Sequence, residues 1–131
     1  MSWRKLGRRL RDDSGASSVE AVLWLPLFMF FLLLVFDTSM TFLNKSQIYR
    51  LTQDANRGFA TGRLRTTGDT EEFIRTGMAT LGASPVIASS VSGNVIRSEV
   101  RVRAGDLSGV GVLGLIANIE LRIATQHLLE G

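Results

Sequence analysis

The sequence of 131 residues contains no cysteine and a single histidine. Without cysteine there is no disulfide framework, no thiolate zinc site and no cysteine nucleophile, so packing alone must hold the folded part together. A metal site would depend on carboxylates around His127, whereas structural and catalytic metals normally take three or four protein ligands. We therefore expect no metal and no cofactor, and interpret His127 as a residue of a C-terminal strand.

Enzyme signatures are equally scarce. The nucleophile elbow Gly-x-Ser-x-Gly is absent. Residues 109–114 fit Gly-x-Gly-x-x-Gly, but a dinucleotide site needs a helix after this motif and an acidic residue about 20 positions further on. Only 17 residues follow Gly114, and they read as a strand. We expect no enzyme, and interpret residues 105–114 as a flexible loop between strands that could also be a contact surface in an assembly.

Positive charge is confined to the N-terminus. Residues 1–15 carry five basic and two acidic side chains, which accounts for the whole formal charge of +3. The remainder is balanced and has no basic stripe with interleaved aromatics, so we expect no nucleic-acid partner. A basic segment before an apolar run predicts that the N-terminus stays in the cytoplasm.

Residues 21–36 form an apolar run of 16 residues without a charge, bounded by Glu20 and Asp37. At about 1.5 Å per residue the run covers roughly 24 Å, less than a hydrocarbon core of about 30 Å. We therefore expect Glu20 or Asp37 to lie at or inside a membrane interface. A cleavable signal peptide fits less well, because residues 37–42 are a poor Ala-x-Ala cleavage site.

Two residues favour more than a plain membrane anchor. Glu20 is ionisable at the mouth of an apolar helix, a position usually kept because the charge has a partner. Snorkelling to the interface is the alternative reading of Glu20. Pro26 removes one helical hydrogen bond and predicts a kink or local melting.

The junction before the apolar run reads as a processing site. Gly15 is followed by small residues and, five positions on, by Glu20. A glycine before a scissile bond lets an extended backbone enter a narrow active site without a Cβ clash. Taken alone, Gly15 also fits a simple helix-entry turn.

With these features the sequence resembles the TadE-like pseudopilins of the tight adherence (Flp, type IVb) pilus system. The resemblance is carried by Gly15, Ala16, Val19, Glu20 and Pro26, with the acidic Asp37 where the run ends, whereas Ala21 replaces a frequent aromatic. It implies that a prepilin peptidase cuts after Gly15 and leaves Ala16 as the new N-terminus. The Ala16 ammonium and the Glu20 carboxylate would then share one helix face and neutralise each other or a neighbouring subunit.

The rest of the chain predicts a small α+β head. The long helix continues past Asp37 with an apolar stripe at Ile48, Leu51, Ala55 and Phe59, and ends at Gly58 and Gly62. A second helix is predicted over 70–81 with a capping box of Asp69 and Glu72, then strands over 86–91, 95–103 and 118–126 with Ile119, Leu121 and Ile123 inward. Arg97, Arg101 and Arg103 read as the solvated face of an antiparallel sheet, or alternatively as an anion or lipid-headgroup site.

These readings divide the chain into a basic cytoplasmic leader (1–15), a transmembrane helix (16–43) and a periplasmic pilin-like head (44–131). The predicted function is a minor pseudopilin of the inner membrane. Its expected partners are the prepilin peptidase, other pseudopilins or pilins, the inner-membrane assembly platform and the lipid bilayer. The alternative is a bitopic anchor whose head binds a partner or ligand in the periplasm without entering a filament.

Overall fold

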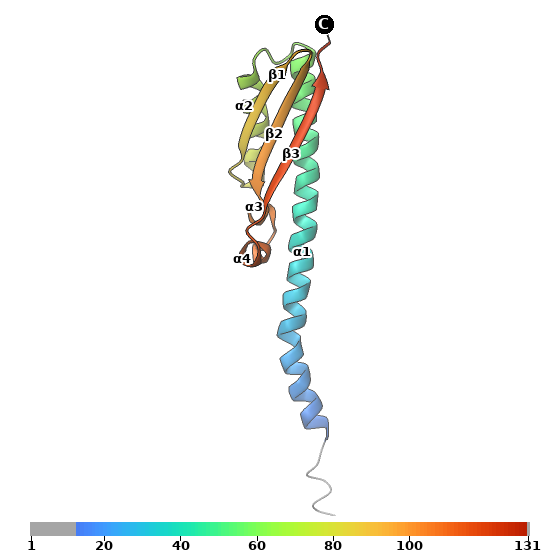
Figure 1. Cartoon of the computed structure of the whole chain (residues 1–131). Helices are drawn as coiled ribbons and strands as arrows, with labels where there is room; N and C mark the ends of the chain where they lie inside the picture. Colours follow the sequence, from blue (N-terminus) through green and yellow to red (C-terminus); the bar gives the residue numbers. More distant parts are fainter. Residues whose placement is uncertain (1–12, 131) are drawn as a thin grey trace, which may run out of the picture. The chain divides into compact units, whose positions relative to one another are not determined.

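The computed structural model describes residues 13–130, which form an α+β fold (Figure 1). Its elements are α1 (Asp13–Ala60), α2 (Thr67–Met78), the 3-10 helix η2 (Ala79–Leu81), β1 (Val86–Ser92), β2 (Val95–Arg103), α3 (Ala104–Leu107), α4 (Val112–Ile116) and β3 (Glu120–Leu128). Two compact units divide between Leu33 and Leu34, and we call the unit that begins at Leu34 the head unit. The predicted class, a long N-terminal helix with a second helix and a three-stranded antiparallel sheet, is confirmed.

The helix α1 is 48 residues long, and its C-terminal part is amphipathic. Ile48 and Ala55 are fully buried and Leu51 packs against them, as the predicted stripe required. The helix ends at Ala60, before Gly62 with φ of +79°, a left-handed conformation that glycine adopts without steric cost. Gly58 lies inside the helix and does not help to end it.

The start of α2 differs from the prediction. Thr66 is the N-cap, its side chain accepts a hydrogen bond from the Asp69 N–H at 3.0 Å, and the Asp69 carboxylate accepts one from the Thr66 N–H at 3.0 Å. The predicted capping box of Asp69 and Glu72 is therefore wrong. The box is formed three residues earlier, by Thr66 and Asp69, which have the same spacing. At the other end the predicted helix stops as expected at Gly82, after the 3-10 turn of η2.

The sheet has the order β1-β2-β3 with both pairs antiparallel. β1 and β2 match the prediction within one residue, and Gly93 with φ of +59° makes the turn between them. β3 begins two residues later than predicted. Because side chains alternate between the two faces of a strand, starting β3 two residues later leaves Ile123 on the buried face. Ile119 lies before the strand and is exposed.

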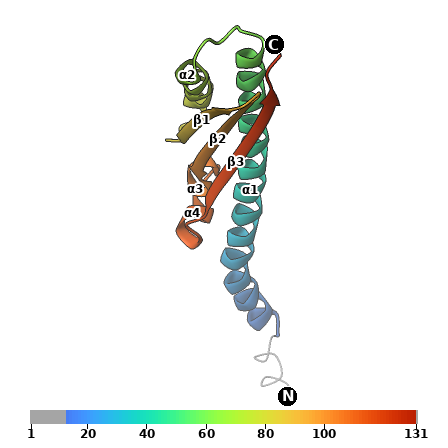
Figure 2. The same cartoon turned by 45° about the horizontal axis from the view of Figure 1, so that its top comes forward.

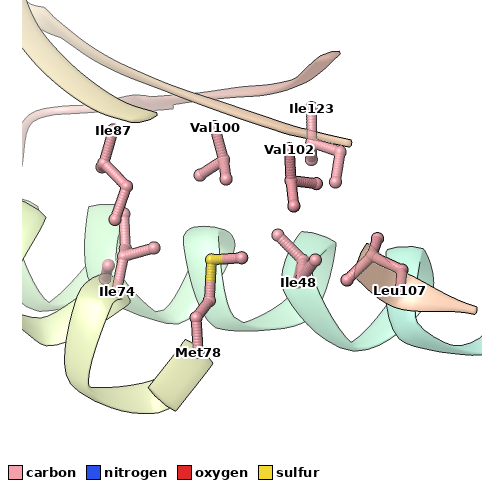
Figure 3. Packing of buried hydrophobic residues seen from close by; sticks show 9 residues of the cluster. Ile48, Ile74, Met78, Ile87, Val100, Val102, Leu107 and Ile123 are labelled. Atoms are coloured by element: carbon pink, nitrogen blue, oxygen red, sulfur yellow. The ribbon is translucent and has the colours of Figure 1, made fainter. Parts of the chain in front are cut away.

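One face of the sheet packs on α1 and α2, as Figure 3 shows. The core between them consists of buried aliphatic side chains with one methionine, namely Ile48, Ala55, Ile74, Met78, Ile87, Val100, Val102, Leu107 and Ile123. Asn56 of α1 crosses this layer: its Nδ2 donates to Thr125 Oγ1 at 2.9 Å, and its Oδ1 accepts from Ser98 Oγ, which also bonds Ser89 Oγ at 2.8 Å. This network ties α1 to all three strands and fixes their register.

The connection between β2 and β3 is more ordered than predicted. Instead of a flexible loop it contains the short helices α3 and α4, which lie beyond the end of β2 (Figure 2). Leu107 of α3 is fully buried in the core, and the Ala104 N–H donates to the Ile119 carbonyl at 2.8 Å. We call residues 104–116 the Gly-rich segment.

Candidate functional site

Gly15 lies in the first turn of α1, where the helix begins. The residue is exposed, its φ is not positive, and a Cβ added to it would meet no atom within 4 Å. In a helix, glycine costs about 1 kcal/mol relative to alanine. Nothing in the described fold requires glycine at this position.

Ala16 and Glu20 are one helical turn apart on α1, and both are exposed. Side chains at this spacing are neighbours, with Cβ atoms about 5–6 Å apart. Within residues 13–130 no ion pair to Glu20 is formed. The fold thus brings these two predicted residues to one face and presents the carboxylate outward.

Pro26 lies inside α1, which continues as a helix on both sides of it. The large apolar side chains around it are exposed in every direction, among them Val22, Leu23, Trp24, Leu25, Phe28 and Phe31. A helix that is apolar all round needs lipid or other subunits to cover it. Among the described residues, α1 is the one helix long and apolar enough to cross a membrane, and it indicates a membrane anchor.

Asp37, which ends the apolar run, is fully buried in the head unit. Its Oδ1 accepts a hydrogen bond from the Val110 N–H at 2.7 Å, and its Oδ2 accepts one from the Leu113 N–H at 3.1 Å. Hydrogen bonds to an ionised acceptor are shorter and stronger than neutral ones. Of the two charges expected at or inside the membrane interface, Asp37 is therefore enclosed by protein and does not face lipid.

Glycines allow the chain to wrap around this carboxylate. Gly111 has φ of +94°, and a Cβ on Gly109 would collide with the Phe36 ring. Gly105 and Gly114 also approach closely, since a Cβ on Gly105 would lie 2.9 Å from the Gly114 Cα. The glycines whose spacing resembles a dinucleotide motif thus belong to a loop that encloses the Asp37 carboxylate. We call this loop, residues 109–114, the Asp37 cradle.

A further residue of α1 holds the Gly-rich segment, since Asn44 Nδ2 donates to the Leu107 carbonyl at 2.7 Å. Thr41 Oγ1 donates to the Asp37 carbonyl of its own helix at 2.8 Å and lies 3.5 Å from the Ala104 carbonyl. Asp37, Thr41 and Asn44 recur at four and then three residues, so they share one face of the helix. The sequence reasoning missed this face, because no local rule pairs Asp37 with a backbone 73 and 76 residues away.

The outer face of the sheet carries the predicted arginine row. Glu99 lies 2.6 Å from Arg101, 2.7 Å from Arg122 and 3.9 Å from Arg97. The hydrogen bond from Arg101 and the positive charges of Arg122 and Arg101 lower the pKa of Glu99 below its ordinary value. Because a carboxylate sits among these arginines, the arrangement favours a solvated, charge-paired sheet face over an anion site.

His127 lies in β3 opposite Ile96. Across residues 13–130 no three His, Asp or Glu side chains gather in a group that could hold a metal ion. The remaining candidates are therefore the N-terminal junction and the Asp37 cradle, both on α1.

A model of the TadE-like protein family matches residues 15–57. This segment, about a third of the chain, is similar to the TadE-like family. The match begins at Gly15 and includes Ala16, Glu20, Pro26 and Asp37, and it confirms the resemblance read from the sequence. No curated protein and no solved structure matches the chain. The TadE-like segment indicates a protein associated with the Tad pilus and, in general terms, with the components that assemble it.

Proposed function

We propose that this chain is a minor pseudopilin of a type IVb (Flp/Tad) pilus. In this proposal a prepilin peptidase cuts after Gly15, and the apolar part of α1 packs against other subunits. The observation that carries the proposal is the TadE-like match, which starts at Gly15 and spans the whole apolar run. The chain would turn over no substrate and need no cofactor.

The local structure around Gly15 supports a processing role. A Cβ added to Gly15 would meet no atom within 4 Å, so the described fold would accept a side chain there. The bond between Gly15 and Ala16 falls in the first turn of α1, where backbone N–H groups lack helical partners. Unwinding this turn into an extended strand costs less than unwinding the helix interior, and a protease binds an extended strand.

The proposed topology follows from charge and length. The basic leader stays in the cytoplasm, α1 crosses the inner membrane and the head lies in the periplasm. The peptidase, sister pseudopilins or pilins, and the assembly platform are the proposed partners. A head of this size is more than the short major pilins of such systems carry, which favours a minor, initiating or tip role.

The decisive experiment is the intact mass of the protein purified from membranes of a cell that carries the peptidase. We expect the wild type to begin at Ala16 and Gly15→Arg to retain residues 1–15, because a long charged side chain cannot enter a site shaped for glycine. Ser2→Arg adds the same charge to the leader away from the junction, and it should be processed normally.

Retention of residues 1–15 in the wild type would overturn the proposal. It would favour the bitopic anchor whose head binds its partner without entering a filament. Normal processing of Gly15→Arg would refute the assigned cleavage position.

A further inference from the structure

The Gly-rich segment presents an apolar end of the head. Residues 107–119 contain no charged side chain, although Asp106 and Glu120 flank them directly. Four large apolar side chains here stay exposed: Leu115 by 87%, Val110 by 58%, Ile116 by 56% and Ile119 by 49%. Contiguous exposed apolar groups mark surfaces that contact a partner or a membrane.

This apolar end lies beside the last residues of the apolar run. Gly109 packs on the Phe36 ring, and the next residue, Val110, donates its N–H to Asp37. Val35 and Phe36 are themselves exposed apolar residues of the head unit. The Gly-rich segment therefore contacts α1 at Phe36 and Asp37, where the apolar run ends. Figure 2 shows α4 at the end of the sheet opposite the C-terminus.

The length of the apolar run gives an independent reason for the head to reach lipid. Sixteen uncharged residues cover roughly 24 Å of a hydrocarbon core of about 30 Å. A span that is too short pulls its flanks into the bilayer or thins it. Asp37 can be drawn toward the boundary without facing lipid, since its carboxylate is already enclosed by backbone donors.

We infer that α4 and its neighbours lie in the interfacial layer of the lipid bilayer, with Leu115 and Ile116 directed at the acyl chains. The head would then be attached to the membrane at two points, α1 and α4, and held in one orientation. Lipid suits this surface better than a second protein copy, because the surface lacks charge and adjoins Phe36, the last residue of the apolar run. The inference rests on α1 as a membrane anchor and not on processing.

The absence of cysteine allows a direct test on the full chain. Leu115→Cys is labelled with a small environment-sensitive fluorophore, and the protein is reconstituted in phosphatidylcholine–phosphatidylglycerol vesicles whose acyl chains carry a quenching nitroxide near the headgroup. Val35→Cys serves as the reference at membrane level. Asn94→Cys serves as the reference at the other end of β2, the end away from the Gly-rich segment. The nine residues of β2 span about 30 Å. All three positions are exposed, so labelling leaves the core intact.

We expect quenching at position 115 to approach that at position 35 and to exceed that at position 94 several-fold. Equal quenching at positions 115 and 94 would overturn the inference. Blue-shifted but unquenched emission at position 115 that depends on the protein-to-lipid ratio would assign the surface to a second copy, and would also overturn it. The vesicles contain no peptidase, so the result does not depend on cleavage after Gly15.

Discussion

At the scale of single residues, Asp37 combines an ionisable side chain with complete burial. A buried carboxylate is costly unless donors or a counter-charge replace its water. No ion pair to Asp37 is formed within residues 13–130, and the donors are backbone N–H groups of the Gly-rich segment. Asp37 thereby connects the end of the apolar run to the fold of the head.

We predict that Asp37→Asn weakens this connection. An asparagine can accept one of the two hydrogen bonds, but its amide NH₂ then faces the other N–H, so one buried donor loses its partner. Amide hydrogen exchange at Val110 and Leu113 should accelerate by an order of magnitude or more, and the midpoint of thermal unfolding should fall by several degrees.

Asp106→Asn is the matched control, because it makes the same chemical change at an exposed carboxylate of the same segment. It should leave both exchange rates unchanged. Unaltered protection of Val110 and Leu113 in Asp37→Asn would show that the carboxylate does not hold the segment.

At this scale local spacing carried the resemblance to the TadE-like family, because Gly15, Ala16 and Glu20 lie within six residues of each other. The contacts of Asp37 and Asn44 were not predictable in this way, since their partners are backbone groups more than 60 residues away. Only the closed fold brings them together.

At the scale of elements, the bounds of β1 and β2 were predicted almost to the residue. The alternation of apolar and charged residues marks β2, and the glycine turn at Gly93 marks where β1 ends and β2 begins. The errors lie where two signals compete. Thr66 and Asp69 both resemble N-caps, and the one that forms the reciprocal box begins the helix. The short helices α3 and α4 have too few residues to show a period, so the sequence indicated only a loop.

The charged face of the sheet predicts a pH dependence of stability. Because its neighbours lower the pKa of Glu99 in the folded chain, the carboxylate stabilises the fold fully above the ordinary glutamate pKa. This contribution is lost as the pH falls through the lowered folded pKa. The effect should be small, since Arg97, Arg101 and Arg122 are half exposed and solvent screens them.

The measurement compares the wild type with Glu99→Gln, which keeps the shape of the side chain and removes its charge. Thermal unfolding of both is followed from about pH 7 to about pH 3, across the ordinary carboxylate range. The difference should be present at pH 7 and shrink toward zero in acid. A difference that grows in acid, or never appears at neutral pH, would contradict the assigned pairing.

At the scale of the whole molecule, one helix serves two environments. The large apolar side chains of α1 up to Leu33 are exposed, whereas Ile48, Ala55 and Asn56 are buried in the head unit. The sequence predicted this division because a run without charges gives way to an amphipathic period. It could not predict that Asp37 binds the Gly-rich segment, because the Val110 and Leu113 N–H groups that donate to it lie 73 and 76 residues further along the chain.

Glu20 concerns the assembly of the whole molecule with other subunits. The carboxylate is exposed at the start of the apolar part of α1 and forms no ion pair within the described chain. A charge at such a position is stabilised when a partner supplies the opposite charge. In the proposed pseudopilin, the partner is an N-terminal ammonium of the same or a neighbouring subunit.

We predict that Glu20→Ala and Glu20→Gln insert and are processed normally, but recover several-fold less of their partner subunits on purification from detergent-solubilised membranes. Both variants remove the charge, and glutamine keeps the shape, so a shared defect identifies the charge as the cause. Ser17→Ala, an exposed change one turn earlier, controls for general disturbance of the helix start and should recover partners as the wild type does. Both Glu20 variants could instead begin at Ala16 and recover their partners as the wild type does. That result would show that the cut takes place but the carboxylate plays no part in assembly. The exposed position of Glu20 would then reflect snorkelling at the interface.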